Sequence, residues 1–306
     1  MAPSTRKAVL TALDLLGYER PERLRPHPSG LIGMIVPELT NPIFPIFAQN
    51  LESTMSTAGY TPLLCTQAAG GITEDSYVQM LIDQHAAGII FVSGLHADTS
   101  ASTDRYQRLE DLGIPAVTIN GNRQEISAPD FSTNDAAAIA QGVRHLASLG
   151  HTRIGLAMGP DRFIPSQQKA LGFKETMENM FPGEPSPIVN TLYTVEGGQA
   201  AAAQLIAMGC TAILCGSDIM ALGAIRYCES SYFKVPEDIS IMGYDDSPLM
   251  VFTNPPLTTF RQPVRSMCEA ALSTLSSLIG GATVSPRSLS FESELIVRKS
   301  TGPCPN

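Results

Sequence analysis

The chain has 306 residues, a length that suits two α/β lobes of ordinary domain size better than one small core. Hydrophobic residues make up 43% and charged residues 16%, which excludes a disordered chain. The formal charge of −9 excludes a surface devoted mainly to nucleic acid, and the positive excess lies in residues 1–25, where five cations face three carboxylates.

From residue 31 onward, short continuous apolar runs alternate with longer segments of helical periodicity. A run such as LIGMIV is typical of a strand buried on both faces of a parallel sheet. The strands predicted in the first half are residues 31–36, 60–65, 87–92, 115–119 and 131–133. The helices predicted between them are residues 41–57, 74–85 and 106–112.

The same alternation starts again at residue 135. The helices of this second series are 135–149, 166–179, 197–208 and 219–227, and its strands are 154–158, 189–192, 212–215 and 239–242. Alternation at this spacing predicts right-handed βαβ units. We therefore expect an α/β fold of two doubly wound parallel-sheet lobes, with a ligand cleft beyond the carboxyl ends of the strands.

The last part of the chain adds one predicted helix at 264–279 and one strand-like segment at 289–297. Because a lone helix and a lone strand can complete two different lobes, the chain is expected to make several crossovers between them. The polar tail, residues 300–306, is expected to fray.

Signatures of enzymes and of metal sites are missing from the sequence. It contains no GxxxxGK[ST] phosphate loop, no GxGxxG after a strand and no GxSxG nucleophile turn, so the chain is predicted not to be an enzyme. The five histidines lack metal-ligand spacing, and neither a metal nor a cofactor is expected. The six cysteines form no CxxC pair and are predicted to be buried free thiols. With no signal peptide and no membrane-spanning run, a cytoplasmic protein is expected.

Asp245 stands out among the acidic residues because it follows the predicted strand 239–242 at the edge where the cleft should lie. A carboxylate at this place can accept hydrogen bonds from sugar hydroxyls or from an amine. Its position alone leaves a turn-capping role equally open. Asp246 should point the opposite way and not share a site with it, because neighbours on an extended segment face opposite sides.

Six segments together resemble the sensor core of the LacI/GalR family of bacterial transcriptional regulators. They are GMIVPELTNPIF (33–44), HLASLGHTRI (145–154), SDIMALGA (217–224), VPEDISIMGYDD (235–246), PPLTTFRQP (255–263) and LIVRKST (295–301). All six stand in the family's order and spacing. The resemblance is therefore far more specific than any single motif.

This resemblance implies a periplasmic-binding-protein-like core that forms homodimers and binds a small polar effector, a sugar or a related molecule. The first lobe would comprise residues 31–134 and 262–286, and the second lobe residues 135–261 and 287–306. The effector would tune the affinity of a repressor for operator DNA. The alternative is a periplasmic-type solute-binding protein for transport. It shares the two-lobed fold but would require a signal peptide or a lipid-anchor cysteine.

Carried over position by position, the resemblance implies a set of effector-binding residues. They are Ile43, Phe44, Ser93, Asn120, Lys169, Leu214, Ser217 and Asp245. Lys169 stands where the family usually has arginine, and Leu214 where an aromatic residue is common. The order Asn134-Asp135 reverses the usual Asp-Asn.

Residues 1–30 resemble a remnant of the family's helix-turn-helix headpiece followed by a hinge linker. Residues 4–18 resemble only the third helix of that headpiece, so specific binding to operator DNA is expected to need the complete headpiece. The DNA-proximal remnant comprises Arg20, Arg23, Leu24 and Arg25. It is interpreted either as a minor-groove segment or as a basic linker, and the prolines around it favour the linker.

The N-terminus is most similar to the catabolite-control branch of the family, which binds a phosphorylated carrier protein through basic residues on the helix that matches 264–279. In this chain Arg265 is the only cation of that segment, and serines occupy the other positions predicted to be exposed. A phosphate-binding surface needs clustered Arg or Lys. The sequence therefore favours a small-molecule effector over a phosphorylated carrier protein.

Overall fold

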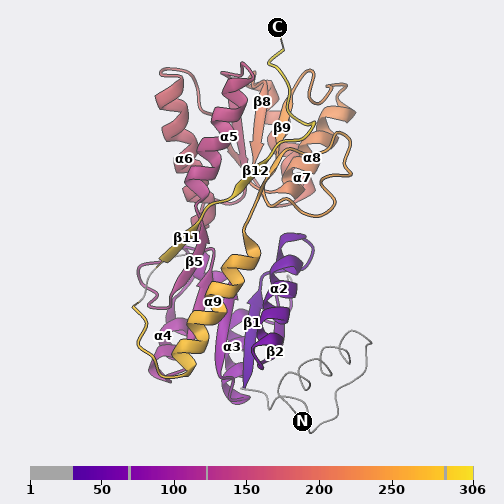
Figure 1. The fold of residues 1–306 in the computed structure, drawn as a ribbon. Coiled ribbons are helices and arrows are strands. Elements are labelled where there is room, and N and C mark those ends of the chain that lie inside the picture. The colour runs from indigo at the N-terminus through magenta and orange to yellow at the C-terminus, as the bar shows by residue number, and fades with distance from the viewer. Residues whose placement is uncertain (1–29, 68–69, 122, 286–287, 306) are drawn as a thin grey trace, which may run out of the picture.

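The computed structural model describes residues 30–67, 70–121, 123–285 and 288–305, and it consists of two α/β lobes stacked end to end (Figure 1). The sheet of the first lobe has six parallel strands in the order β11-β5-β4-β3-β1-β2. These strands are β1 (Leu31–Val36), β2 (Thr61–Thr66), β3 (Gly88–Val92), β4 (Ala116–Ile119), β5 (Asp130–Thr133) and β11 (Ser288–Phe291). The arrangement agrees with the predicted doubly wound sheet.

Helices cover both faces of this sheet. Helices α2 (Ile43–Thr57) and α9 (Val264–Ile279) pack on one face, and α3 (Glu74–Asp83) and α4 (Asp104–Asp111) pack on the other. Side chains of β1 alternate between the two cores, with Met34 in the first and Ile35 in the second. This alternation is why the apolar run at 31–36 is continuous.

The second lobe has a four-stranded parallel sheet in the order β7-β6-β8-β9. Its strands are β6 (Ile154–Met158), β7 (Ile188–Asn190), β8 (Ala212–Cys215) and β9 (Ser240–Met242). Its helices are α5 (Asp135–Ser148), α6 (Ile164–Met180), α7 (Val195–Ala207) and α8 (Asp218–Ser230). Helices α5 and α6 pack in one core, and α7 and α8 pack in another.

The lobes are joined at a hinge that contains two short antiparallel strands, β10 (Thr259–Arg261) and β12 (Glu294–Ile296). The chain passes between the lobes after β5, after β10 and after β11 (Figure 1). The predicted crossovers are therefore present. Strand β10 was not predicted, because its three residues carry no periodic signal.

One predicted boundary differs from the structure. Residues 287–306 were expected to belong wholly to the second lobe, with one strand at 289–297. Instead, β11 pairs in parallel with β5 and forms the edge of the first-lobe sheet. Two residues then separate β11 from β12 at the hinge. The pairing joins segments far apart in sequence, which local periodicity does not reveal.

Residues 300–304 of the C-terminal tail are held against the second lobe, so the prediction that the tail frays was wrong for these residues. The backbone of Ile241 donates to Ser300, and that of Cys304 donates to Leu149, each at 2.8 Å. The buried ring of His151 lies 3.0 Å from the carbonyl oxygen of Gly302. The first of these bonds satisfies a backbone donor on the edge of β9, and the second satisfies the carbonyl oxygen of the residue that ends α5.

The cysteines agree with their predicted state: all six are free thiols, and all but Cys304 are buried. Within the described residues, no helix combines the length and the apolar character needed to cross a membrane. The predicted DNA-proximal residues Arg20, Arg23, Leu24 and Arg25 lie outside the described part of the chain.

Candidate functional site

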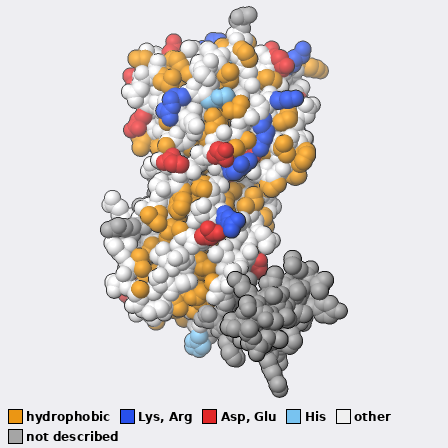
Figure 2. Space-filling model, viewed as in Figure 1, with side chains coloured by type: hydrophobic (Ala, Val, Ile, Leu, Met, Phe, Trp, Pro, Cys, Tyr) orange, Lys and Arg blue, Asp and Glu red, His pale blue; other side chains and the backbone are white. Residues whose placement is uncertain are grey.

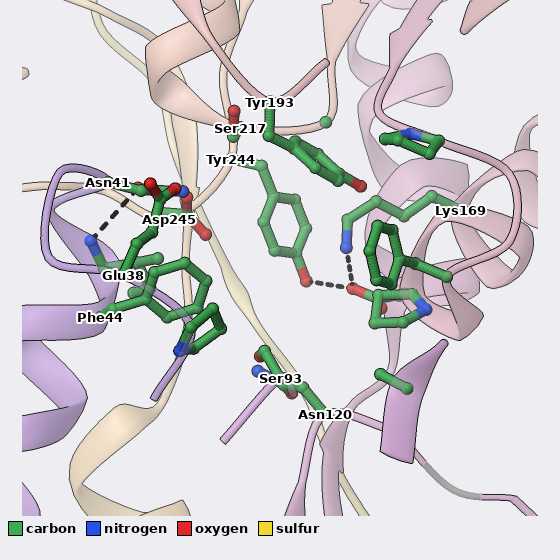
Figure 3. A pocket seen from close by; sticks show the side chains of 18 of the residues that line it. Glu38, Asn41, Phe44, Ser93, Asn120, Lys169, Tyr193, Ser217, Tyr244 and Asp245 are labelled. Carbon is green, nitrogen blue, oxygen red and sulfur yellow. Dashed lines mark hydrogen bonds and ion pairs between the residues drawn. The ribbon is translucent and has the colours of Figure 1, made fainter. Parts of the chain in front are cut away.

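A cavity of about 350 Å³ lies between the two lobes (Figure 3). Its first-lobe wall comes from the start of α2 and from the loops that follow β3 and β4. Its second-lobe wall comes from the starts of α5 and α6 and from the loops that follow β7, β8 and β9. The carboxyl ends of two parallel sheets thus face each other across this space, which is where doubly wound folds bind ligands.

Seven of the eight predicted effector-binding residues line this cavity. They are Ile43, Phe44, Ser93, Asn120, Lys169, Ser217 and Asp245. Leu214 does not, because it lies inside β8 with its side chain buried in the core that α5 covers. The cavity wall begins only at Gly216, after the strand has ended. The expectation that Leu214 contacts the effector is therefore corrected.

Three of the lining residues have left-handed backbone conformations. The φ angles are 46° at Ser93, 64° at Asn120 and 120° at Asp245. Such angles cost a non-glycine residue about 1–3 kcal/mol and persist only where the surroundings impose them. The backbone N–H of each donates to a neighbouring strand, at 2.8, 3.2 and 2.8 Å respectively. Backbone strain is therefore present at three strand ends that border the cavity, and such strain is typical of functional sites.

A buried ion pair forms part of the second-lobe wall. Nζ of Lys169 lies 2.6 Å from Oδ1 of Asp135, and the hydroxyl of Tyr244 donates to the same oxygen at 2.7 Å (Figure 3). The same ammonium group lies 4.0 Å from the centre of the Tyr244 ring. Asn134 caps α5 by accepting from the backbone of Ala137, which leaves the carboxylate of Asp135 free to turn toward the cavity.

Asp245 is held from the hinge side. Nε2 of Gln262 donates to Oδ1 of Asp245 at 2.7 Å, and Oε1 of Gln262 accepts from the Thr133 hydroxyl at 3.0 Å. Burial raises the pKa of Asp245 well above its ordinary value, and the nearby Asp218 raises it further. Asp246 turns away and pairs with Arg261 and Arg298, as expected for its opposite face.

A second buried carboxyl lies behind this wall. Ser217 caps α8 by accepting from the backbone of Met220 at 3.3 Å. Asp218 follows it, with one oxygen accepting from the Thr259 hydroxyl at 2.6 Å and the other from the backbone of Ser247 at 2.7 Å. Burial raises the pKa of Asp218 to about 7, against these hydrogen bonds, which lower it. Both carboxyl oxygens of Asp218 are therefore hydrogen-bonded behind the second-lobe wall, while the buried hydroxyl of Ser247 has no partner among the described residues.

The lobes also meet on the side of the cavity away from the hinge. Nε of Arg162 lies 2.8 Å from Oδ2 of Asp98, and the backbone of Thr99 donates to the carbonyl oxygen of Arg162 at 2.9 Å. Asp98 and Phe163 form an antiparallel bridge. We call these residues, 98–99 and 162–163, the interlobe clasp. Arg162 and Phe163 line the cavity, so the clasp forms one end of it.

Aromatic rings and a few charged side chains give the cavity its chemical character. Phe44, Phe163, Tyr193 and Tyr244 present ring surface. Tyr193 packs so closely over Gly159 that a Cβ there would lie 2.0 Å from the ring. Among the described lining residues the two cations are Lys169 and Arg162, and each is paired with a carboxylate.

Sequence reasoning missed several of these residues. They are Asp135, Arg162, Tyr193, Tyr244 and Gln262. Tyr244 and Tyr193 each follow a predicted strand, so strand-end position was a usable signal for these two. Gln262 follows the unpredicted β10, and its only signal was its place in the motif 255–263. Asp135 was noted only for its reversed order beside Asn134.

Comparison with known proteins agrees with this architecture. Residues 143–301 match the model of the periplasmic binding protein-like domain. The HTH-type transcriptional regulator MalR of Streptomyces coelicolor is 51% identical over 310 residues, covering 100% of this chain and 90% of that protein. The HTH-type transcriptional regulator reg1 of Streptomyces lividans is 51% identical over 311 residues, with the same coverage.

Two solved structures are similar throughout both lobes. A LacI family transcriptional regulator from Enterococcus faecium with bound ribose has a TM-score of 0.78 and 25% identity, covering 89% of this chain and 99% of that one. The transcriptional regulator CelR in complex with cellobiose has a TM-score of 0.80 and 26% identity, covering 98% and 91%. On the fold, the six motifs and these relatives, the chain belongs to the LacI/GalR family of transcriptional regulators.

Proposed function

We propose that this regulator senses a neutral sugar in the cavity between its lobes, and that sugar binding changes the affinity of a homodimeric repressor for operator DNA. The observation that carries the proposal is the chemistry of the cavity wall. Aromatic ring surface stands beside a few converging polar groups, as in sites that bind and orient small ligands. Amides and carboxyl groups such as those of Asn120 and Asp245 can pair with sugar hydroxyls.

The ion pairing of the cavity supports a ligand without charge. A phosphorylated ligand would need clustered, available cations, whereas Lys169 is engaged with Asp135 and Arg162 with Asp98. A cationic ligand would favour an ionised carboxylate, whereas burial raises the pKa of Asp245. The ribose and cellobiose bound to two related regulators are neutral sugars, which supports the same choice.

The remaining parts of the proposal follow from family membership. The body of the protein presents Lys, Arg, Asp and Glu side chains interspersed over the described face seen in Figure 2, so operator contact is assigned to the headpiece rather than to this surface. A dimer would place two headpieces on two half-sites. This role requires no catalysis, places the protein in the cytoplasm with its DNA, and is favoured over solute transport because the related proteins are regulators.

A phosphorylated carrier protein is not part of the proposal. On α9 the exposed Arg265 pairs with Glu269 at 2.8 Å on the same helix. Several of its neighbours at the surface are serines, so the described part of α9 offers no cluster of cations for a phosphoryl group.

A thermal-shift screen tests the sugar proposal. Neutral mono- and disaccharides, sugar phosphates, nucleosides and amino acids are each added to the protein. A sugar at one hundred times its dissociation constant should stabilise the protein by ~2.7 kcal/mol. The Asp245→Ala variant, which removes a cavity carboxyl, should lose most of that shift. Stabilisation by sugar phosphates alone would overturn the proposal.

A further inference from the structure

A second cavity, of about 220 Å³, adjoins the first on the side of α6 and β11. The two cavities share three lining residues, Asn120, Asp135 and Pro165. The boundary between the two spaces is thus formed by residues that face both. We call the larger space the inner chamber and the smaller one the outer chamber.

The outer chamber differs chemically from the inner one. Its first-lobe side carries the hydroxyls of Ser132, Ser288 and Ser290, and its second-lobe side carries the amide of Gln168. The described residues around it include no aromatic ring, whereas rings form much of the inner chamber. Hydroxyls and amides both donate and accept hydrogen bonds, which matches the hydroxyls of a sugar without selecting a charge.

The outer chamber also opens to solvent. Gln168, Ser288 and Ser290, which line only the outer chamber, are exposed. Lys169 and Tyr244, which line only the inner chamber, are buried, and Arg162 at the clasp end of the inner chamber is half exposed. Because Asn120 and Asp135 line both spaces, a ligand in the inner chamber that passed these two residues would enter the outer chamber. A monosaccharide would occupy only one of the two spaces.

From this arrangement, which rests on the sugar proposal above, we infer that the effector is a linear oligosaccharide of at least two units. One unit lies against the aromatic rings of the inner chamber, and the next lies among the serine hydroxyls and Gln168 of the outer chamber. Both lobes line both chambers. The second unit therefore adds contacts across the same cleft and favours the same closed arrangement of the lobes.

Two substitutions on β11 test the outer chamber. One fills only this chamber, and the other, at a neighbouring residue, is its control. Ser288 and Ser290 face the outer chamber, whereas Leu289 between them does not line it, as expected for alternating side chains on β11. Ser290→Phe fills the outer chamber from an exposed position and should leave the fold intact. Leu289→Phe places the same ring on the opposite face of the strand.

Isothermal titration calorimetry of the full chain tests the inference. The ligands are glucose, xylose, galactose and mannose, with the linear di- and trisaccharides of each in α and β linkage. We expect at least one oligosaccharide to bind tenfold or more tightly than its monosaccharide. Ser290→Phe should remove that advantage without changing the affinity for the monosaccharide, and Leu289→Phe should leave both affinities unchanged.

Three results would contradict the inference, and only one of them would also contradict the sugar proposal. Equal affinity for a monosaccharide and its oligosaccharides would overturn the inference that the outer chamber binds a second sugar unit. The sugar proposal would still stand. An oligosaccharide preference that survives in Ser290→Phe would equally overturn the chamber. If no sugar of the panel binds the wild-type protein while a ligand of another class does, the sugar proposal itself fails and the inference fails with it.

Discussion

The two walls of the cleft are built in different ways. On the second lobe, Asp135, Lys169 and Tyr244 are locked together by short side-chain contacts, and Gln262 at the hinge donates a hydrogen bond to Asp245. On the first lobe, Ser93 and Asn120 are placed by left-handed turns of the backbone at the ends of β3 and β4. The difference suggests that the second lobe reads the ligand with preorganised side chains, while the first lobe supplies a shaped wall that closes over it.

The largest expected effect comes from the ion pair of the second lobe. Lys169→Met leaves the carboxylate of Asp135 without its cation in a nearly buried position. Breaking such a pair from one side should lower the free energy of unfolding by ~3 kcal/mol. Urea unfolding measures this loss. Combining Lys169→Met with Asp135→Asn should recover part of the lost stability. The control Lys174→Met, at an exposed lysine on the same helix, should change the free energy of unfolding little. A loss of less than about 1 kcal/mol in the free energy of unfolding would show that the stability of the second-lobe wall does not depend on this ion pair.

The next effect concerns ligand binding. Asp245→Ala removes a carboxyl at the centre of the second-lobe wall and should weaken sugar binding by ~1–3 kcal/mol, the cost of leaving a buried hydrogen-bonding group of the ligand without a partner. Calorimetry with the sugar found by the screen gives the change in affinity. Asp246→Asn is the matched control, because Asp246 pairs with Arg261 and Arg298 outside the cavity. Equal losses in both variants would contradict the assignment.

Asp245 and Asp135 also show how much of the site could be predicted from the sequence. Asp245 was predicted because it follows a strand and lies in a family motif, and the alternating pattern predicted nearly every helix and strand. The role of Asp135 was not predicted, because its direction depends on Lys169 approaching from another helix. Leu214 was carried over from the family resemblance although it lies inside the strand predicted at 212–215, where its side chain is buried in the core. The pairing of β11 with β5 has no local signal.

A further effect should appear in the pH dependence of stability. The pKa of Asp218 is raised from 3.8 to about 7 in the folded protein, so the folded state holds a proton that the unfolded state releases. Its contribution to stability is therefore greatest below pH ~4 and is lost as the pH rises toward ~7. Asp218→Asn removes this dependence. The stability of the wild type relative to the variant should fall across that interval in urea titrations, and a constant or rising difference would contradict the raised pKa.

The smallest effect is expected at the interlobe clasp. The side chain of Arg162 is half exposed, so its pair with Asp98 is screened by solvent and is worth ~0.2–1 kcal/mol. Arg162→Ala should weaken sugar binding by at most that amount, because the backbone bonds of Thr99 remain. Small-angle scattering of the sugar-free protein should show slightly more open lobes. A loss of affinity as large as that of Asp245→Ala would mean that the side chain of Arg162, which lines the cavity, contacts the sugar directly.

The central claim is that one sugar engages both walls of the cleft at once. Hydrogen–deuterium exchange, with and without the sugar found by the screen, tests it most directly. The account predicts that the backbone amides of Ser93 and Asn120 in the first lobe and of Asp245 in the second become protected together, with little change on the faces remote from the cavity. Protection confined to one lobe, or located away from the cavity, would contradict it.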